Sequence, residues 1–596
     1  MQYAKLRAAL ATNPQVKAIL LNDAPLEEKR LALRSYLSDL LITVFDRTEK
    51  LPSMEWILCR DAIWAFRNLL SPRSEELAGY SFLEYLVAVL KASDRGRKPK
   101  PPSPGFIAEV EHLIRGISGT AKVYTEKAPA FLKYSGRKAA RLRSIHLSRM
   151  ARAAAQKMAA YPCGLDDHLL RERSTAKLAI QGSFNITDVE WNDWKWHTRH
   201  IIRDADTLRS LIALDDKEYE AVRLARLHRI PFGITPYYLS LFDPANSKTY
   251  DTAVRAQVIP PLDYVRKMLK NRQADDCAND FMSEQDTSPI DGITRRYPNI
   301  VIIKPVLTCP QICVYCQRNW QIEDVYSESA ILSPDSQEKA LAWIENTPEI
   351  NEVLITGGDP FLLPDPLIEQ LMARVASIKH VHRIRLGTRT PVTLPQRITE
   401  SLARAITRFH EPGRREVMVV THFEHVAEIT PEAMAAVQRF RLFGIEVYNQ
   451  LVYTFFNSRR FETAALRQKL RLIGVTPYYT FNTKGKEETD AYRVPIPRLL
   501  QEQDEEARLL PGTVRTDEIV FNVPRLGKNY LKASQHRDLI SILPDGRRVY
   551  EFHPWEKKLA LMDTYVYTDV SIDGYLKRLK QAGENINDYR TIWYYY

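Results

Sequence analysis

Cysteine is scarce in this chain of 596 residues, which contains only six. So low a content excludes a fold held together by a framework of disulfides. Three cysteines are isolated in the sequence and predict buried or unreactive thiols: Cys59, Cys163 and Cys277. The other three follow one another closely: Cys309, Cys313 and Cys316.

Long apolar runs are also missing, since no stretch has the length needed to cross a bilayer. The N-terminal stretch contains acidic residues and a short apolar patch. A signal peptide would need a longer apolar patch. We therefore expect a cytoplasmic protein with no membrane partner. An apolar content of 45% and a charged content of 26% are typical of a globular protein, and the length predicts two or more domains.

Acidic residues are depleted in a single segment. Residues 91–157 contain 16 Lys and Arg against four Asp and Glu, a local net charge of +12, while the whole chain carries +11. Within this segment the proline-rich run 95–106 predicts a linker, and residues 136–160 predict a strongly basic helix. A solvated helix is the simpler interpretation. A nucleic-acid surface is the alternative, although no interleaved aromatic residues support it.

The three clustered cysteines have the spacing C-x3-C-x2-C, with no fourth cysteine nearby. A closed iron–sulfur cluster normally takes four thiolates, so three suggest a cluster with one open iron. An incomplete zinc site and thiols that only pack in a core are the alternatives. The candidate histidines for a zinc site lie far along the chain, at His410, His422 and His425.

The motif, with Tyr315 just before its last cysteine, resembles the signature of radical SAM enzymes. That resemblance implies a [4Fe–4S] cluster on Cys309, Cys313 and Cys316, whose open iron binds S-adenosylmethionine (SAM) and, when reduced, splits it to a deoxyadenosyl radical. The runs WNDWKW (191–196), ITPYY (234–238) and DTSPIDGITRRYP (286–298) occur in the same order as similar runs in the lysine 2,3-aminomutase family. The resemblance to that family covers roughly residues 185–596.

Strand and helix patterns alternate after the cysteines. Helices are expected at 336–346, 366–377, 399–409, 431–443 and 463–473, each followed by an apolar strand. With the strand before Cys309 they predict six parallel strands, and the resemblance implies an α/β fold with a partial (β/α)6 TIM-like barrel of the radical SAM type. An open doubly wound sheet is the alternative. We expect four segments: a helical N-terminal extension (1–184), a helical lead-in (185–290), the barrel (291–500) and a C-terminal segment (501–596).

The run TGGDP (356–360) ends the strand after the cysteines. Consecutive glycines let a ligand approach the backbone closely, although in isolation such a run is an ordinary turn. The family resemblance implies that the SAM-binding residues are Gly357, Gly358, Asp359, His422 and Gln450. The last two could equally be core polar groups with satisfied hydrogen bonds.

The aminomutases of this family also use pyridoxal 5'-phosphate (PLP), held by a lysine after a glycine-rich turn. The corresponding stretch here is PRLGK, ending at Lys528, in which one glycine remains and the spacing is shorter by one. The resemblance implies that Lys528 holds PLP, with Lys532 or no lysine as alternatives. It further implies that Arg296 and Tyr297 contact the phosphate and the ring, while a second arginine of the family is Ile300 here.

Three further residues match positions that bind the substrate in the family. Arg318 matches an arginine that pairs with the α-carboxylate. Lys484 and Asn522 replace two aspartates that bind the side-chain ammonium in the lysine enzymes. Because an ammonium and an amide suit a carboxylate, the replacement resembles glutamate 2,3-aminomutases. Lys484 pointing to solvent is the alternative.

The sequence therefore predicts a radical SAM and PLP-dependent amino-acid 2,3-aminomutase, an isomerase, with L-glutamate as the expected substrate. Lysine or another amino acid is the first alternative. The second is a radical SAM protein that has lost PLP and binds nucleic acid or protein. An electron donor such as a flavodoxin or ferredoxin is an expected partner, and a homo-oligomer is possible. The lysine enzymes of the family tend to carry C-terminal cysteines for a structural zinc. No cysteine follows Cys316 here, so the comparison with them predicts no zinc.

Overall fold

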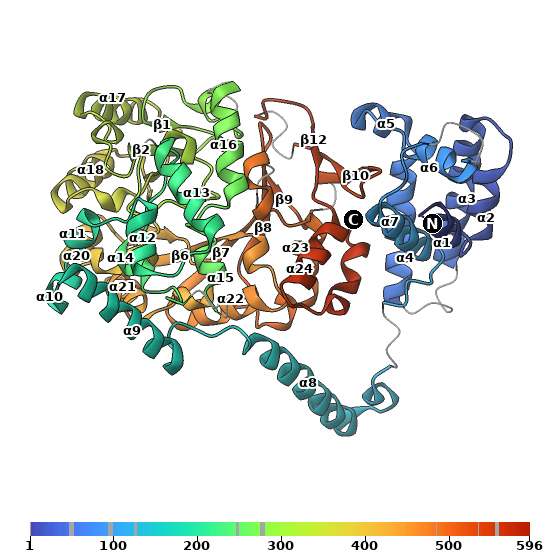
Figure 1. The fold of residues 1–596 in the computed structure, drawn as a ribbon, viewed down its shortest axis with the longest axis horizontal. Coiled ribbons are helices and arrows are strands. Elements are labelled where there is room, and N and C mark those ends of the chain that lie inside the picture. Colours follow the sequence, from blue (N-terminus) through green and yellow to red (C-terminus); the bar gives the residue numbers. More distant parts are fainter. Residues whose placement is uncertain are drawn as a thin grey trace. The chain divides into compact units, whose positions relative to one another are not determined.

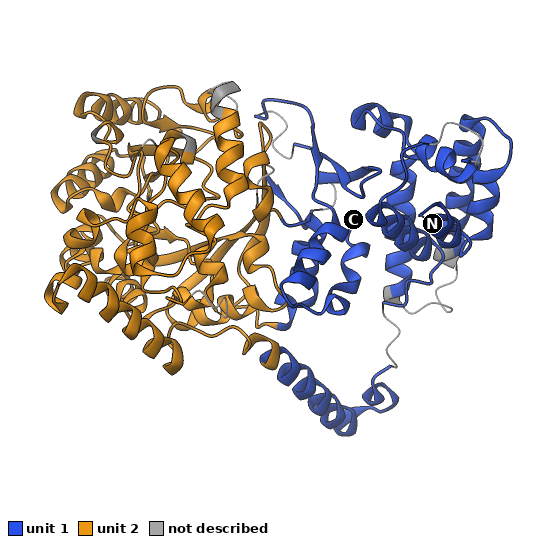
Figure 2. Ribbon diagram, in the orientation of Figure 1, with its two compact units in different colours: residues 1–155, 494–509, 528–596 blue, residues 156–493, 510–527 orange. Residues whose placement is uncertain are grey.

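The computed structural model describes residues 2–46, 53–92, 99–123, 128–245, 250–274, 280–322, 324–483, 486–533, 536–554 and 559–596. The chain divides into two compact units (Figure 2). Unit 1 comprises residues 1–155, 494–509 and 528–596, and unit 2 comprises residues 156–493 and 510–527. None of the helices in the described ranges has the length and apolar character needed to cross a membrane.

Unit 2 is built on strands that pair in chain order (Figure 1). The strands are β1 (Ile293–Thr294), β2 (Ile300–Val306), β3 (Glu352–Gly357), β4 (Arg383–Gly387), β5 (Glu416–Thr421), β6 (Glu446–Tyr453), β7 (Val475–Asn482) and β8 (Glu518–Val523). β1 is antiparallel to β2, and each later strand is parallel to the one before it. β2 is a nearly continuous apolar run, as in parallel sheets covered on both faces, whereas β4 and β6 alternate between buried and more exposed residues.

Five helices form the crossovers between β2 and β7. They are α17 (Pro334–Glu345), α18 (Asp365–Ser377), α20 (Glu400–Thr407), α21 (Pro431–Leu442) and α22 (Glu462–Leu472). Two of them begin with a hydroxyl cap followed by proline: Ser333 accepts from the N–H of Ser336, and Thr430 from that of Ala433, each at 3.1 Å. Such caps satisfy N–H groups that a helix start leaves without partners.

The expected βα alternation is confirmed, and each expected helix begins and ends within two residues of its observed bounds. The structure adds one parallel strand, β8, to the six expected from the sequence. β8 and β2 do not pair in the strand order, so the sheet is the partial barrel expected rather than a closed one. The fold class predicted from the sequence is therefore confirmed, with seven parallel strands.

Helices precede the barrel in unit 2. They are α9 (Asp167–Phe184), α10 (Asp188–Trp191), α11 (Trp194–Arg199), α12 (Ala205–Leu211), α13 (Asp216–Leu227), α14 (Pro236–Leu239), α15 (Thr252–Arg255) and α16 (Leu262–Ala274), and a further short helix, α19 (Thr390–Thr393), follows β4. We call residues 185–290 the lead-in, as above. Its aromatic residues pack on one another, and Trp196 and His200 stack with ring centroids 4.5 Å apart.

Unit 1 joins the two ends of the chain. Its N-terminal helices are α1 (Gln2–Leu10), α2 (Pro14–Leu21), α3 (Leu26–Asp46), α4 (Ser53–Leu69), α5 (Pro72–Ala78), α6 (Phe82–Lys91), α7 (Pro104–Ile117) and most of α8 (Gly136–Met158). Its later elements are α23 (Ile496–Glu505), β9 (Gly527–Tyr530), of which Gly527 belongs to unit 2, β10 (Arg537–Ile542), β11 (Arg548–Phe552), β12 (Tyr565–Thr568) and α24 (Ile572–Gln581). The strands β10, β11 and β12 form an antiparallel meander.

A buried ion pair connects these two parts of unit 1. Arg548 on β11 donates to Glu109 on α7 from Nε and Nη2, at 2.9 to 3.1 Å, and both side chains are about 2% exposed. Arg548 also donates to the carbonyl oxygens of Trp593 and Tyr595, at 2.6 Å each. The compact units consequently have different boundaries from the four expected segments, because the N-terminal helices share a core with the C-terminal strands.

The helices expected in the N-terminal region are present. α1 to α6 cover most of the described residues before the proline-rich run, and the basic helix expected at 136–160 is α8. The structure describes every residue of α8, and Ala154 is its one buried residue. Of the isolated cysteines, Cys59 and Cys163 are buried as expected, and Cys277 lies outside the described residues.

Candidate active site

The cysteine loop, residues 308–317, follows the carboxyl end of β2 and is held by the lead-in. The N–H of Ile312 donates to the carbonyl of Gly233 at 3.0 Å, and the N–H of Val314 donates to that of Gln257 at 2.9 Å. Ile312 and Val314 are buried, while Cys309, Cys313 and Cys316 are partly exposed. Alternate residues of the loop therefore anchor it and leave the thiols accessible for a ligand.

Cys309, Cys313 and Cys316 share one loop, and all three thiols are partly exposed. Among the residues that the structure describes, no three Cys, His, Asp or Glu side chains converge as ligands of one ion. An iron–sulfur cluster on these three cysteines stays a prediction from the motif.

The glycine pair after β3 packs against the strand that leads into the cysteine loop. A Cβ on Gly358 would lie 2.1 Å from the carbonyl oxygen of Thr308. The backbone N–H of Gly358 donates to the carbonyl oxygen of Val306 at 2.7 Å. Gly357 has a φ of +123°. The absence of side chains is therefore required at both positions, where the backbone lies directly beside the residue that precedes Cys309.

Asp359 organises the neighbouring turn rather than standing open to a ligand. Its buried carboxylate accepts from the Thr388 hydroxyl at 2.7 and 2.9 Å, and from the N–H groups of Phe361, Arg389 and Thr390 at 2.9 to 3.1 Å. These bonds fix the loop after β4, which carries Arg389. A contact of Asp359 with SAM stays a prediction.

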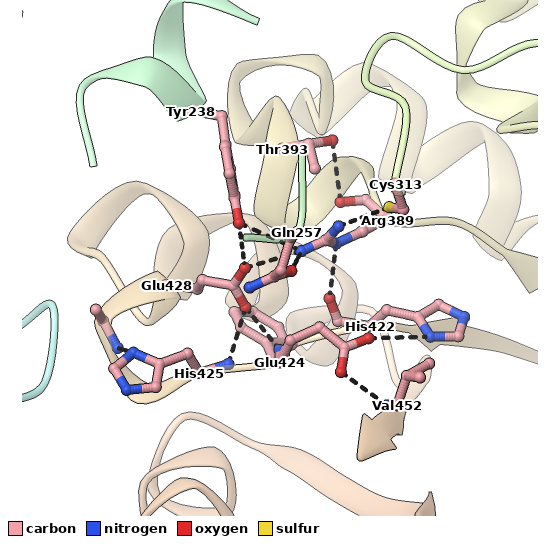
Figure 3. Close-up of polar contacts among 12 residues, drawn as sticks. Tyr238, Gln257, Cys313, Arg389, Thr393, His422, Glu424, His425, Glu428 and Val452 are labelled. Atoms are coloured by element: carbon pink, nitrogen blue, oxygen red, sulfur yellow. Dashed lines mark hydrogen bonds and ion pairs between the residues drawn. The ribbon is translucent and has the colours of Figure 1, made fainter. Parts of the chain in front are cut away.

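Arg389 is the central cation beside the cysteine loop (Figure 3). Its Nη1 lies 2.7 Å from the sulfur of Cys313, and its Nη2 donates to Glu428 at 2.8 Å. The fully buried Glu428 also accepts from the hydroxyl of Tyr238 at 2.7 Å, and Gln257 accepts from Arg389. Two residues of the lead-in are thereby tied to the barrel and to a predicted cluster ligand.

His422 and Gln450, both expected in the SAM pocket, lie together. The ring of His422 is hydrogen-bonded to the backbone of Gln450, and burial followed by the charge of Arg389 lowers the pKa of His422 to about 4. The nearby Glu424 accepts from the N–H of Val452 at 2.7 Å, and burial raises its pKa to about 8. This part of the site therefore favours neutral side chains near pH 7.

A second polar group lies on the other side of Cys316 and centres on Glu284. Arg318 donates from Nε to both carboxylate oxygens of Glu284 at 3.0 Å, and Lys304 on β2 donates to one of them at 3.1 Å. Nη2 of Arg296 lies 3.7 Å from the same carboxylate. We call Arg296, Lys304, Arg318 and Glu284 the Glu284 cluster.

The Glu284 cluster is buried and strongly coupled. Burial alone would raise the pKa of Glu284, but the charges of Arg318, Lys304 and Arg296 outweigh it and lower the pKa to about 2. The backbone N–H of Arg318 lies 3.4 Å from the sulfur of Cys316, so the cluster adjoins the cysteine loop directly. Two of the predicted binding residues, Arg296 and Arg318, are thus brought together.

Two of the remaining predicted residues, Asn522 and Lys528, lie on β8 and β9. Gly527, with a φ of +87°, lies so that a Cβ on it would be 3.5 Å from the hydroxyl of Tyr297. Lys528 follows Gly527 in β9, so the backbone before the predicted PLP lysine passes the predicted ring-contacting tyrosine. Asn522 is half-buried on β8. Lys484 lies outside the described residues.

Several residues of the site were missed from the sequence: Tyr238, Gln257, Glu284, Lys304, Arg389 and Glu428. One of them carried a usable signal. Lys304 is a single lysine inside the apolar strand IVIIKPVLT, and a buried lysine needs a carboxylate partner. The others are polar residues whose burial depends on segments far away in the chain.

Comparisons with known proteins agree with the site. The sequence profile of the radical SAM superfamily matches residues 303–421. The chain is 43% identical to an uncharacterized KamA family protein of Methanocaldococcus jannaschii, over 98% of this chain and 96% of the relative. It is 31% identical to a glutamate 2,3-aminomutase of Clostridioides difficile, over 67% of this chain and 89% of the relative. It is 32% identical to an L-lysine 2,3-aminomutase of Methanococcus maripaludis, over 56% of this chain and 73% of the relative.

Proposed function

Because the chain belongs to the KamA family of radical SAM enzymes, isomerases that use a [4Fe–4S] cluster, SAM and PLP, we propose that it is an amino-acid 2,3-aminomutase acting on L-glutamate. The reaction exchanges the amino group on C2 with a hydrogen on C3, so that L-glutamate becomes β-glutamate. No atom is gained or lost. An external reductant is required to reduce the cluster, and an electron donor such as a flavodoxin or ferredoxin would supply the electron.

The observation that carries this proposal is the Glu284 cluster beside Cys316. Its buried cations suit a substrate and a cofactor that are both anionic. Arg318 already binds a carboxylate, since its Nε–H is shared between the two oxygens of Glu284. Nη2 of Arg296 is buried and has no hydrogen-bond partner among the described residues. A buried N–H donor without an acceptor fits a site in which the phosphate of the bound cofactor is the acceptor.

Different residues of the site would bind each of the three cofactors. When bound, the cluster and SAM supply a carbon radical, and PLP supplies a π system through which nitrogen can migrate. Cys309, Cys313 and Cys316 would hold the cluster, and SAM would be bound by Gly357, Gly358, Asp359, His422 and Gln450. Arg296, Tyr297 and Lys528 would hold PLP.

The side chains of the protein position the substrate. Arg318 would orient the α-carboxylate with its Nη groups, while Glu284 holds its Nε. The second carboxylate would bind to the ammonium of Lys484 and to the side-chain amide N–H of Asn522. A lysine substrate would instead meet a like charge at Lys484, which is the reason for preferring glutamate.

The test is an anaerobic assay of the full chain with reconstituted cluster, SAM, PLP and a chemical reductant. We expect β-glutamate to form from glutamate, and we expect the double change Lys484→Asp and Asn522→Asp to shift the preference toward lysine. Turnover of lysine but not glutamate by the wild type, with no effect of the double change, would contradict the substrate assignment.

The cofactor assignment has its own test. Lys528→Ala is expected to lose the visible absorbance of lysine-bound PLP, and Lys532→Ala is the matched control that should keep it. Retention of that absorbance in Lys528→Ala and its loss in Lys532→Ala would move the assignment to the second lysine.

A further inference from the structure

Lys304 is a buried lysine that none of the roles above uses. It lies within the apolar strand β2, its side chain is 9% exposed, and its ammonium nitrogen is 3.1 Å from Oε1 of Glu284. Removing an ammonium from water is costly, so a buried lysine is stable only with a partner of opposite charge. Glu284 is such a partner, but it is shared.

The charges in the Glu284 cluster do not balance. Arg296, Lys304 and Arg318 bring three positive charges, and within the described ranges Glu284 is the one carboxylate that contacts all three. Asp280 also acts on Arg296, but among the groups in contact there is an excess of +2. The hydroxyl of Thr294 also donates to Glu284, at 3.1 Å, so the acceptor capacity of that carboxylate is largely used. A buried excess of two positive charges calls for a dianion.

The hydrogen bonds indicate which cations are available to that dianion. Arg318 is engaged with both oxygens of Glu284. Arg296 donates from Nε to the Thr287 hydroxyl at 3.4 Å, while its buried Nη2 makes no hydrogen bond within the described part of the chain. Lys304 carries three donors on its ammonium, and the hydrogen bond to Glu284 uses one of them.

We propose that Lys304, together with Arg296, binds the phosphate of PLP, and that Glu284 is a positioning residue which holds the two cations and Arg318 in one group. This inference rests on the proposed function, since it names a ligand for a cofactor of that site. A phosphate monoester is largely a dianion near pH 7 and offers three acceptor oxygens, so it matches the excess charge and the remaining donors. Its binding would bring the net charge of the cluster to zero.

Glu284 connects the proposed phosphate position with the predicted α-carboxylate position. Glu284 touches Lys304 and Arg296 with the same carboxylate that holds Arg318, so the phosphate position and the predicted α-carboxylate position are set by one side chain. The ammonium of a lysine is a compact charge, and the guanidinium of an arginine is a planar group with several N–H donors. Together the two side chains can donate hydrogen bonds to different oxygens of a phosphate.

The experiment is a titration of PLP-free protein with PLP, followed by the visible absorbance of the bound cofactor. Lys304→Met is expected to weaken PLP affinity by about 10- to 100-fold, the range for losing one charged hydrogen bond. Lys304→Arg is expected to recover most of the affinity. Lys267→Met is the matched control, because Lys267 is also a lysine of unit 2 paired with carboxylates, Asp263 and Asp490, and should bind PLP like the wild type.

Pyridoxal, which lacks the phosphate, is the second probe. Its affinity should be the same for Lys304→Met and the wild type, since the lost contact is to the phosphate alone. Equal PLP affinities of Lys304→Met and the wild type, or an equal loss for PLP and pyridoxal, would overturn the assignment. A wild type that takes up no PLP would instead contradict the proposed function.

Discussion

His197 offers a direct test of the packing in the lead-in. Its side chain is fully buried on α11, and Nε2 donates to the carbonyl oxygen of Trp191 at 2.7 Å. The ring packs edge to face against Trp191 and Trp196, with centroids 4.9 and 5.0 Å away. Burial lowers the pKa of His197 to about 4, from the value of 6.5 for an unperturbed imidazole.

The sign of the pH effect follows from these two values. Between pH 6.5 and 4 the unfolded chain binds a proton at His197 and the native protein does not, so the free energy of unfolding falls as the pH decreases through that window. Relative to neutral pH, the loss from this one group is about 2 kcal/mol near pH 5.

The variant His197→Gln keeps an N–H donor for Trp191 but cannot take up a proton in this range. Urea unfolding would be followed by tryptophan fluorescence near pH 5 and near pH 7.5 for the wild type and the variant. From pH 7.5 to pH 5, the unfolding free energy of the wild type should fall by about 2 kcal/mol more than that of the variant. Other buried histidines, such as His112, contribute equally to both proteins and cancel. An unchanged difference between the unfolding free energies of the two proteins at the two pH values would refute the reasoning.

Two further changes test the buried ion pair and the glycine pair. Glu109→Gln leaves the Arg548 charge buried without its carboxylate and should lower the unfolding free energy by about 3 to 5 kcal/mol, measured by urea unfolding, with Glu109→Leu/Arg548→Met recovering most of it. Stability of Glu109→Gln equal to the wild type would contradict the pairing. Gly358→Ala should reduce the iron content after cluster reconstitution, because its Cβ would collide with the Thr308 backbone, whereas Gly182→Ala meets no atom within 4 Å and should load normally. Equal iron in both variants would show that the loop tolerates the shift.

Repeating local patterns made the barrel predictable. Each strand from β2 to β7 is a short segment with buried apolar residues, and the helices between the strands have apolar residues at helical spacing, so length and period identify them without tertiary information. β8 was missed because its sequence, EIVFNV, is a short apolar run that does not follow an expected βα unit. Its place beside β7 depends on Thr480 and Arg467, which bind Asp517 just before β8 at 2.6 and 2.8 Å.

The buried polar residues of the site could not be predicted in the same way. Arg389 follows a strand, as expected for a site residue, but its partners Tyr238 and Glu428 lie 151 and 39 residues away in the chain. The ion pair of Glu109 and Arg548 spans 439 residues. Local sequence carries no information about such pairs, because an arginine on a loop has the same local pattern whether it is solvated or buried.

The contacts of the cysteine loop explain why the lead-in belongs with the barrel. The loop makes no helix or strand of its own around its cysteines, so neighbouring segments must satisfy its N–H groups. Gly233 and Gln257 do so from the lead-in, and Tyr238 from the same region bonds to Glu428, the carboxylate partner of Arg389. A barrel without the lead-in would leave the N–H groups of the cysteine loop and the charge network of Arg389 incomplete. The lead-in is therefore a structural requirement for the cysteine loop and not a separate domain, which agrees with unit 2 beginning at residue 156.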